Sequence, residues 1–537
     1  MPNVKKIIAK LNKYHLLQLL ILVLAIALRF YKLGQVPHGM TVDEAAIGYN
    51  GYAVLNYRRD EWLNRLPISF TSFGDFKAPF SIYLNGFFTY LFGMNLYAVR
   101  LPFALFSIVA IFFFMELVKL LLNHYSNLSK DNVAMISLWS GLLMTLSPWH
   151  HHFSRVGFES GIALSITILA VYFIELYYLA VKNKEKNKII YLLLSSLFFS
   201  LTFYTYHSSK LVTPLVLIAL YFTNKKIHKK NIKDSIKYLI FFLLFSTPFI
   251  YDSLFGNSLN RAQALVIMQD LPLLEKISVI FKNILSHLSP NFLVLGETFT
   301  LRHGSGKWGV LMPLTFLLLL VQVWKLFIRI LNKAKTFFVN KRVLILSTII
   351  ILIGMSPAFL GAEYPHSNRA LLAAPGFYLV AAYILNASCL NLSKRKKTLM
   401  IINILAVMFV QTYLYQYYYY TGFAAKSSAD FNDGMIEAFE EVNKIKAENP
   451  DIIQVMFTSN YGQPYIYGLF VNKISPQDYQ WGAQRYYWWA DNIEVSDLFR
   501  KNNIIVASAE DDMPLEDAKK IIYGSDGEPR FIIYMGK

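Results

Sequence analysis

Two adjacent carboxylates, Asp43 and Glu44, follow the first long apolar run of the sequence. At a membrane surface, a carboxylate could take a proton from an acceptor hydroxyl while a sugar is transferred to it. A structural role is the alternative, because Thr41 or Asp43 could cap a helix expected over residues 44–56. The residues alone leave both interpretations open.

Three cationic residues could bind a phosphate group at the depth of the lipid headgroups. Lys77, within Phe76-Lys77-Ala78-Pro79, would act as a point charge. Arg369 and Arg100 each stand at the outer start of an apolar run, where a guanidinium could grip a phosphate in a forked geometry. Long cationic side chains also reach the interface without binding anything. The scarcity of Lys and Arg in these segments favours a functional role for both arginines.

A run of three histidines, His150 to His152, lies between two apolar runs and invites a metal interpretation. Adjacent side chains point in different directions, so one ion rarely takes all three. His151 and His152 are therefore weak candidates, and a divalent metal stays possible. Arg155 and Glu159 follow with a spacing of four, which would let them form an ion pair at the start of a helix.

The composition indicates an integral membrane protein. Of the 537 residues, 55% are hydrophobic, above the roughly 45–50% of soluble domains. The apolar residues come in long runs, and roughly 20 such residues form a helix that crosses about 30 Å of hydrocarbon. The net charge of +18 could suggest nucleic acid. Most lysines lie in short loops between apolar runs, so membrane topology explains the charge better and no nucleic-acid partner is expected.

Several motifs of soluble enzymes are absent from the sequence. It contains no Gly-x-x-x-x-Gly-Lys-Ser/Thr loop, no Gly-x-Gly-x-x-Gly after a strand and no His-Glu-x-x-His. Its one cysteine, Cys389, excludes an intramolecular disulfide. Without a nucleotide-binding motif, a sugar donor presented by the membrane itself is the natural expectation.

Eleven membrane-spanning helices are expected. They cover about residues 14–32, 97–122, 132–148, 159–181, 189–206, 210–224, 236–252, 308–331, 343–360, 370–389 and 398–420. The first lacks a small-residue cleavage site and is interpreted as a span rather than a signal peptide. Four short loops are rich in basic residues: Lys182 to Lys188, Lys225 to Lys233, Lys333 to Arg342 and Lys394 to Lys397. With the basic N-terminus in the cytoplasm all four loops are cytoplasmic, and the C-terminus lies outside.

Two domains are expected. Residues 1–420 would form the membrane domain, including an outward segment over 33–96 with interfacial helices at 44–56 and 80–92. Residues 421–537 have the composition of a soluble α/β domain outside the membrane. Its expected elements are helices at 434–448 and 515–522 and strands at 452–458, 503–508 and 530–534. The aromatic residues between Tyr479 and Trp489 could stack on sugar rings or simply pack against the membrane domain.

The order of these features resembles the membrane-embedded GT-C glycosyltransferases, in particular the protein O-mannosyltransferases and the lipid A aminoarabinose transferases. The resemblance rests on motifs in sequence order: Asp43-Glu44, Leu66-Pro67, Asp75-Phe76-Lys77-Ala78-Pro79-Phe80, Leu91-Phe92-Gly93, Ala98-Val99-Arg100-Leu101-Pro102, Ser147-Pro148, Arg155, Glu159, His366, Arg369 and Pro375. These motifs fall in about 40–160 and 361–376, while the layout covers the whole chain. The resemblance implies a GT-C fold and an inverting transfer from a polyprenyl-phosphate sugar to a lipid, glycan or protein acceptor at the outer surface of the cell membrane.

The same resemblance implies roles for individual residues. Asp43, with Glu44 beside it, matches the catalytic acid, and Lys77 matches the lysine that contacts the donor phosphate. Arg100, Arg155 and Arg369 would add charge around that phosphate, and Glu159 and His366 would act as a second acid or on the acceptor. Two departures are visible: the family's Lys-Pro-Pro is Lys77-Ala78-Pro79, and Glu159 stands where Asp is common.

A transporter or lipid flippase is the alternative class. Such proteins place charged groups within their spans and often show internal repeats. Here Glu116 and Glu175 are the exceptions among spans otherwise nearly free of acids, and no repeat is evident. The candidate functional charges lie at the outer surface rather than within the spans, which favours the transferase.

Overall fold

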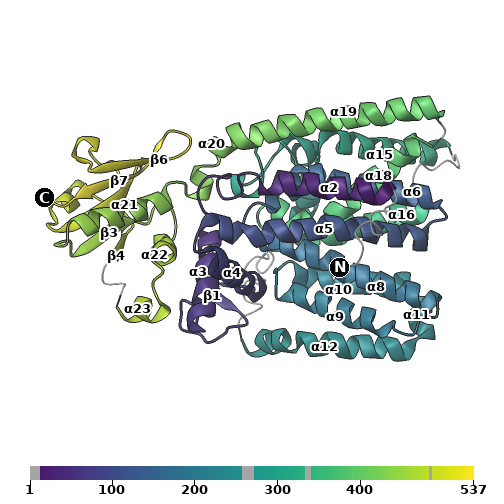
Figure 1. Ribbon diagram of the computed structural model, residues 1–537, viewed down its shortest axis with the longest axis horizontal. Helices are drawn as coiled ribbons and strands as arrows, with labels where there is room; N and C mark the ends of the chain where they lie inside the picture. The colour runs from purple at the N-terminus through teal and green to yellow at the C-terminus, as the bar shows by residue number, and fades with distance from the viewer. Residues whose placement is uncertain (1–12, 257–270, 333–339, 391, 483–486) are drawn as a thin grey trace, which may run out of the picture.

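The computed structural model describes residues 13–256, 271–332, 340–390, 392–482 and 487–537. It shows a bundle of long helices with a small α/β domain attached to one end (Figure 1). The predicted architecture, a helical polytopic membrane protein with a C-terminal α/β domain, is confirmed.

All eleven predicted spans are helical. The bundle consists of α2 (Lys13–Phe30), α5 (Leu96–Tyr125), α6 (Lys130–Leu146), α8 (Glu159–Lys182), α9 (Ile189–Phe203), α10 (Ser209–Thr223), α12 (Ile232–Phe255), α15 (Pro313–Asn332), α16 (Lys341–Phe359), α18 (Ala374–Ser388) and α19 (Lys394–Tyr418). Among the described residues, seven helices are long and apolar enough to cross a membrane, and α9 and α10 are shorter apolar helices. The protein is therefore a multi-pass membrane protein, and the count of eleven spans stays a prediction.

The basic loops gather at the end of the bundle remote from the C-terminal domain. The short helix α11 (Lys225–Lys230) and the lysine-rich start of α19 both lie at that end (Figure 1). Lys182 at the end of α8 and Lys184 and Lys188 in the loop that follows it line one pocket together with Lys230, and so belong to the same end. Of the remaining cluster, Lys341 and Arg342 begin α16, whereas Lys333 and Lys335 lie outside the described residues. This common location is what the predicted topology requires.

The opposite end of the bundle carries short elements rather than loops alone. Helix α3 (Val42–Tyr57), a hairpin of β1 (Phe70–Ser72) and β2 (Asp75–Lys77), and helix α4 (Pro79–Phe92) lie between the bundle and the C-terminal domain (Figure 1). Helices α3 and α4 cross in close contact, because a Cβ added to Gly51 would lie 2.6 Å from the Gly86 nitrogen and one added to Gly86 would lie 2.4 Å from the Gly51 oxygen. The predicted helices at 44–56 and 80–92 are thus present and hold the hairpin in place.

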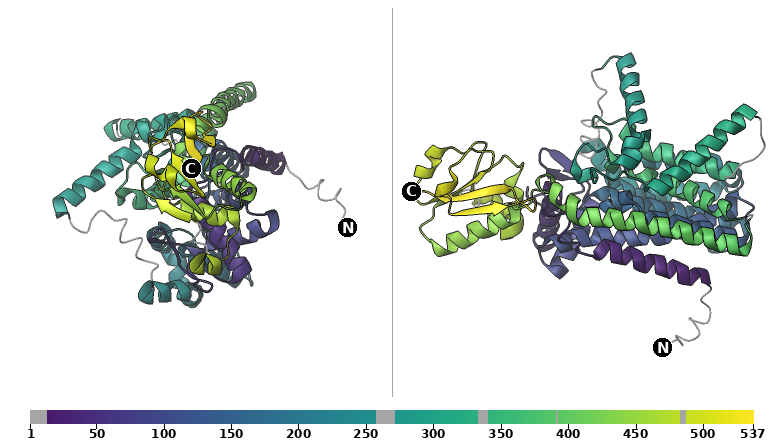
Figure 2. Two further views of the ribbon diagram at one scale, coloured as in Figure 1. Left: turned by 90° about the vertical axis from the view of Figure 1, so that its left-hand side faces the viewer. Right: turned by 90° about the horizontal axis from the view of Figure 1, so that it is seen from above.

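Further elements complete this end of the bundle, next to the C-terminal domain. They are α7 (Pro148–Phe153), α14 (Leu273–Leu288), η1 (Asn291–Leu295), η2 (Leu301–His303) and α17 (Ser367–Ala370). Helix α14 was not predicted, and in the right-hand view of Figure 2 it projects away from the bundle, as α15 does. Its leucine, isoleucine and phenylalanine side chains are largely exposed, as expected for an amphipathic helix resting at a membrane interface.

The C-terminal domain is built on a five-stranded sheet. Its elements are α21 (Met435–Glu448), β3 (Gln454–Thr458), α22 (Pro464–Asn472), α23 (Pro476–Trp481), β4 (Tyr487–Ala490), β5 (Asn503–Ser508), β6 (Lys520–Tyr523) and β7 (Pro529–Met535). The strand order is β4-β3-β5-β7-β6; β3 runs parallel to β4 and β5, and β7 runs antiparallel to β5 and β6. The three predicted strands and the helix at 434–448 are confirmed.

The predicted helix at 515–522 is wrong. Leu515–Asp517 forms only a single 3-10 turn after Pro514, and Lys520–Tyr523 is edge strand β6. Ile521 pairs with Ile532 of β7, so the neighbouring strand outweighs the local helical tendency of residues such as Glu516 and Ala518. The short edge strands β4 and β6 were missed for the same reason.

The aromatic residues of this domain pack mainly inside the protein. Tyr487 and Trp489 stack with ring centroids 5.3 Å apart, beside Phe439 and Phe457. Trp481 and Trp488 are exposed, whereas Tyr486 lies outside the described residues. Packing therefore accounts for most of the stretch that sugar stacking could also have explained.

The C-terminal domain is fixed directly onto α3. The hydroxyl of Tyr49 donates to the Ile474 carbonyl at 2.8 Å, and the hydroxyl of Tyr467 donates to the Met40 carbonyl at 2.7 Å. Phe470 packs so closely on α3 that a Cβ on Gly48 would lie 2.7 Å from its ring. Residues on both sides of this contact share one apolar core. The start of α3, with Asp43 and Glu44, is thereby held between the bundle and the domain.

Candidate functional site

The N-terminus of α3 is capped by Thr41, which supports the interpretation of this segment as a helix start. The Thr41 side chain accepts from the Glu44 amide at 3.2 Å, and the Glu44 carboxylate accepts from the Thr41 amide at 3.0 Å. This reciprocal pair is a capping box, which satisfies two of the amides that a helix start leaves open. It fixes Glu44 toward the protein interior, on the other side of the first turn from Asp43.

Glu44 is buried in an ion pair with Arg100 of α5. The Arg100 Nε lies 2.7 Å from Glu44 Oε1 and its Nη2 lies 3.1 Å from Oε2. The amide of Gly157 donates to the same carboxylate at 3.0 Å, and a Cβ on Gly157 would lie 2.5 Å from Glu44 Cγ. These contacts of Glu44 connect α3, α5 and the segment just before α8. The Glu44 carboxylate is therefore buried and fully engaged by protein groups.

Arg100 has no free face for a phosphate either. Besides Glu44, it donates to the carbonyls of Pro37 at 2.8 Å and Gly39 at 2.9 Å, and it is fully buried. Arg155 is likewise fully buried and donates to backbone carbonyls, at 2.8 Å to Arg29 and 2.9 Å to Val36. The expectation that these two arginines bind the donor phosphate is not supported by their geometry. Both hold the segment between α2 and α3 in shape.

Asp43 has a different environment. Its carboxylate forms an ion pair with Lys77, the last residue of β2. The Lys77 side chain is nearly buried, at 4% exposed, whereas the Asp43 side chain is 29% exposed. The Lys77 ammonium also lies 5.7 Å from the ring centre of Phe73 in the hairpin turn. Two residues from separate elements thus bring a carboxylate and an ammonium group together at a place that solvent reaches.

A second group of ionisable residues lies near Asp43. His303 of η2 and His366 contact ring to ring, with centroids 4.4 Å apart. The imidazole of His366 lies 3.4 Å from Glu363, and Arg369 donates to the same Glu363 carboxylate at 3.3 Å. The Arg369 Nη1 is buried without a hydrogen-bond partner. Arg369 therefore lies where the sequence placed it, with part of its guanidinium unsatisfied.

Electrostatics connect this group to Asp43. Burial lowers the pKa of His303 well below its usual value, and the charge of Asp43 opposes that shift. Burial also lowers the pKa of His366, while the hydrogen bond from His366 lowers the pKa of Glu363. Both histidines are accordingly neutral at pH 7, and Glu363 is ionised. Asp43, Lys77 and this group form one polar site at the end of the bundle that carries the C-terminal domain.

Arg302 and His303 were missed by sequence reasoning. The charge of Arg302 favours a lower pKa for both Glu363 and Tyr467, so Arg302 is within electrostatic range of the second group and of the C-terminal domain. Its turn is anchored by Asp430, which accepts from the Leu301 amide at 3.1 Å. The available signal was the abundance of His and Arg in the outward segment 253–307, but nothing in the sequence shows which of those residues meets Asp43.

The histidine run does not form a metal site. His150 contacts Arg29 at 3.0 Å, His151 contacts Tyr415 at 3.1 Å and the Leu28 carbonyl at 3.1 Å, and His152 contacts the Arg302 carbonyl at 2.8 Å. The three rings point into three different environments, as adjacent residues must. No group of three metal-ligating side chains occurs within the described ranges. His151 and His152 are thus corrected from weak metal candidates to packing residues.

Glu61 is a buried carboxyl that the sequence did not single out. It is fully buried, and neither carboxyl oxygen has a hydrogen-bond partner. Burial, with the charge of Asp60, raises its pKa to about 8, against the opposing charge of Lys77. Its backbone carbonyl accepts from Gln480 of α23 at 2.7 Å, which places Glu61 under the C-terminal domain. It is a neutral acid beside the Asp43–Lys77 pair.

The fold defines a class: it is the fold of the GT-C membrane glycosyltransferases. The structure of ArnT from Cupriavidus metallidurans bound to undecaprenyl phosphate matches with a TM-score of 0.54 and 12% identity, over 96% of this chain and 97% of that chain. The same protein in the apo state matches with a TM-score of 0.55 and 11% identity over the same shares. The archaeal oligosaccharyltransferase AglB from Archaeoglobus fulgidus, in complex with an inhibitory peptide and a dolichol-phosphate, matches with a TM-score of 0.50 and 10% identity over 96% of this chain and 74% of that chain.

One sequence family matches part of the chain. The family described as dolichyl-phosphate-mannose-protein mannosyltransferase matches residues 76–251. This range begins beside Lys77 and includes Arg100, Arg155 and Glu159. No curated protein matches the sequence at a significant level. The predicted resemblance to membrane-embedded GT-C glycosyltransferases is confirmed by the family match and the structural matches together.

Proposed function

We propose that the protein is an inverting glycosyltransferase that moves a sugar from a polyprenyl-phosphate donor to an acceptor on the outer face of the cell membrane. The observation that carries this proposal is the partly exposed Asp43–Lys77 pair, where a base and a phosphate-binding cation meet. Support comes from the fold it shares with proteins solved with undecaprenyl phosphate and with a dolichol-phosphate. The matching mannosyltransferase family covers the segment that contains Lys77.

Asp43 is the proposed base of the reaction. An acceptor hydroxyl attacks the anomeric carbon of the donor sugar from the face opposite the phosphate, and Asp43 takes the hydroxyl proton. A bond forms between the acceptor oxygen and the anomeric carbon, while the bond between that carbon and the phosphate oxygen breaks. The electron pair of the broken bond leaves with the polyprenyl phosphate. The configuration at the anomeric carbon is inverted.

Lys77 stabilises the departing phosphate. The ammonium group is nearly buried, so its charge acts through less solvent than a surface lysine would. It is paired with Asp43 in this structure, and a phosphate arriving between the two groups would take over part of that pairing. Arg369 and Arg302 add positive charge to the same polar site, and the buried Nη1 of Arg369, which has no hydrogen-bond partner, is the proposed donor to a phosphate oxygen.

Other predicted site residues act indirectly in this proposal. Glu44, Arg100 and Arg155 position the start of α3 and touch no substrate. His366 is a neutral side chain beside the ionised Glu363, and its proposed role toward the acceptor or as a second acid rests on the family resemblance. Glu159 stands in the first turn of α8, close along the chain to Gly157, which holds Glu44. Its proposed role as a second acid rests on the family resemblance.

The proposed orientation puts the N-terminus in the cytoplasm and the C-terminal domain outside. The shared location of the basic loops, at the end remote from that domain, supports it. The transporter alternative is less well supported, because the polar site lies at the outward end of the bundle rather than at mid-depth. Glu175, one of the two exceptions, is held by His124 at 3.0 Å and by Tyr125 at 3.3 Å near the opposite end.

The test is sugar transfer in proteoliposomes from a panel of radiolabelled polyprenyl-phosphate sugars. Wild type and Asp43→Asn are compared, with Glu441→Gln on the outer helix α21 as a carboxylate control. The proposal expects transfer or donor hydrolysis by wild type and by the control, and neither by Asp43→Asn. Full turnover by Asp43→Asn would remove Asp43 as the base. Movement of intact labelled lipid between leaflets, without turnover of any donor, would establish the flippase alternative.

A further inference from the structure

A large cavity with a basic lining lies at the end of the bundle remote from the proposed transfer site. Its volume is about 970 Å³. Residues at the ends of α5, α6, α8 and α11 contribute to it, and five of them are lysines: Lys130, Lys182, Lys184, Lys188 and Lys230. Nothing in the proposed transfer reaction uses this cavity.

The charge of the lining is predominantly positive and largely uncompensated. Lys188 pairs with Asp234 at 2.6 Å. Across the part of the chain that the structure describes, the other four lysines of the lining form no ion pair. Of the two acids in the lining, Glu175 is buried and held by His124 and Tyr125, and Glu185 is exposed. Several free ammonium groups thus face one space.

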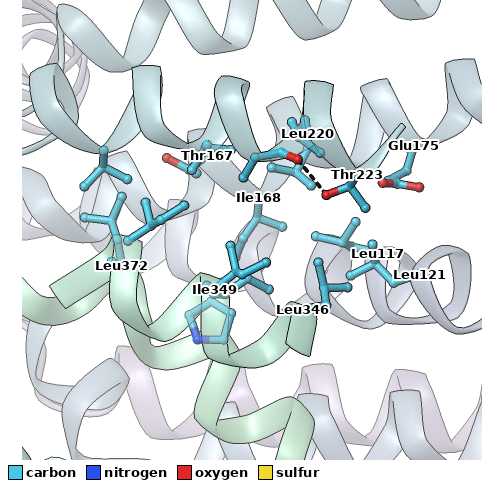
Figure 3. Close-up of a pocket in the computed structure, with 18 of the residues that line it drawn as sticks. Leu117, Leu121, Thr167, Ile168, Glu175, Leu220, Thr223, Leu346, Ile349 and Leu372 are labelled. Carbon is cyan, nitrogen blue, oxygen red and sulfur yellow. Dashed lines mark hydrogen bonds between the residues drawn. The ribbon is translucent and has the colours of Figure 1, made fainter. Parts of the chain in front are cut away.

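The cavity also has an apolar side. Leu120, Leu179, Val181 and Ile227 line it together with the lysines. Glu175 separates it from a second, apolar cavity of about 100 Å³ between α5, α8, α10 and α16. Figure 3 shows Glu175 at one end of that second cavity and Leu372 toward the other, with leucine and isoleucine side chains between them. A molecule with an anionic headgroup and apolar chains would match this basic surface and the apolar surfaces next to it.

We propose that the basic cavity binds the phosphate headgroup of an anionic glycerophospholipid. Lysines act as point charges toward a lipid phosphate, and each one near the membrane surface contributes about 1 kcal/mol to attraction of anionic lipid. The lipid chains lie against the neighbouring apolar helices, where Leu179 is 40% exposed. The site is separate from the donor site, because the two lie at opposite ends of the bundle.

The test measures lipid binding to the purified full-length protein in a neutral detergent. Binding of fluorescent phosphatidylglycerol is compared with that of fluorescent phosphatidylcholine. The variant Lys182→Gln/Lys184→Gln/Lys230→Gln removes three lining lysines. The matched control Lys225→Gln/Lys226→Gln/Lys229→Gln removes the same charge from the same end of the bundle, but from lysines that do not line the cavity. The single variant Lys184→Glu, at an exposed position, repeats the test with a smaller change.

The proposal expects phosphatidylglycerol to bind more tightly than phosphatidylcholine. The lining triple should weaken phosphatidylglycerol binding by at least about tenfold, given the contribution of each lysine, and the control triple should change it less than about threefold. Lys184→Glu should also weaken phosphatidylglycerol binding, because it replaces a positive charge of the lining with a negative one. Equal losses in both triples would overturn the proposal in favour of diffuse surface charge. Displacement of the lipid by millimolar inorganic phosphate would show a soluble-anion site and overturn the lipid assignment. Sugar transfer at the outer end is a separate readout, so its failure would not be confused with either result.

Discussion

Asp43 and Glu44 are neighbours in the chain, but their carboxylates lie in opposite environments. Glu44 is buried, 2.7 Å from the Nε of Arg100, and it closes the capping box of α3. Asp43 is 29% exposed and pairs with Lys77 of the hairpin. The helix separates the two side chains by about 100° around its axis, so one points into the protein and the other toward solvent. We therefore assign the proposed chemistry to Asp43 and a structural role to Glu44, and the two roles can be separated by mutation.

Asp43→Asn should abolish transfer and leave the fold intact. The amide retains the shape of the carboxylate but cannot take a proton, and its site is partly solvated. General base catalysis contributes about 10²- to 10⁴-fold to a rate, so kcat should fall by at least about 100-fold. Steady-state transfer in proteoliposomes measures this, and thermal unfolding in detergent checks the fold. A variant that loses both activity and stability would mean that Asp43 is structural.

Glu44→Gln should destabilise the fold and leave the chemistry of the folded protein intact. It leaves the guanidinium of Arg100 buried without its counter-charge, and breaking a buried ion pair costs about 3–5 kcal/mol. The apparent unfolding temperature should therefore fall clearly, and activity should fall only as far as folded protein is lost. Specific activity per folded molecule, from size-exclusion-purified protein, separates the two effects. An unchanged unfolding temperature with lost activity would return Glu44 to the catalytic group.

Lys77→Met should weaken use of the donor. Methionine preserves the apolar stem of the side chain and removes the ammonium group that the proposed phosphate would contact. The apparent donor KM should rise by about tenfold or more, since a charge-assisted hydrogen bond is worth about 1.5–3 kcal/mol. Donor titrations at fixed acceptor concentration give this value. The control is Lys537→Met, which removes a lysine from the far surface of the C-terminal domain and should leave the donor KM unchanged. An unaltered donor KM in Lys77→Met would mean that Lys77 does not contact the donor phosphate.

Arg302→Gln tests whether the residue missed by sequence reasoning belongs to the site. Arg302 lies close enough to Glu363 to influence its pKa, and it adds positive charge to the polar site. Its loss should raise the donor KM several-fold and raise the pKa of Glu363, because a nearby cation favours the ionised carboxylate. The control is Arg500→Gln, whose guanidinium lies on the surface of the C-terminal domain. Equal kinetics for the two variants would place Arg302 outside the site.

Glu61 should make stability depend on pH. Its pKa is raised from 4.5 to about 8 in the folded protein, mainly by burial. Between these two values the unfolded chain has lost the proton that the folded protein retains. Stability therefore falls as pH rises from about 4.5 to about 8 and is constant above that range. The difference is a few kcal/mol, at about 1.4 kcal/mol per pKa unit.

Glu61→Gln should remove this dependence. The neutral amide resembles the protonated acid, so the variant should match wild type near pH 5 and be more stable near pH 8. The measurement is the unfolding temperature of both proteins across pH 5–8. Taking the difference between the two curves removes the contribution of all other titrating groups. Glu448→Gln, at an exposed position on α21, should follow wild type at every pH. Parallel curves for wild type and Glu61→Gln would mean that Glu61 is ionised in the folded protein.

The sequence by itself determined the membrane architecture. Each of the eleven apolar runs forms a helix, because a segment without water has to satisfy its backbone hydrogen bonds internally. The spacing of the basic loops along the chain predicted that they lie at one end of the bundle. The change of composition near residue 421 predicted the α/β domain. These features depend on local composition, which requires no knowledge of what lies nearby in space. The motifs near Asp43, Lys77 and Arg369 were visible for the same reason.

Only the tertiary structure decided which charged residue does what. Arg100 and Arg155 look like phosphate ligands along the chain, yet the bundle buries both and gives their donors to Glu44 and to backbone carbonyls. His303 comes within electrostatic range of Asp43 from more than 250 residues away in the chain, and the buried Glu61 contacts Gln480 of α23 through its backbone carbonyl. Strand β6 exists only because β7 pairs with it. Burial and long-range contact set the partners, and hence the charge state, of each ionisable group, and neither is encoded in local spacing.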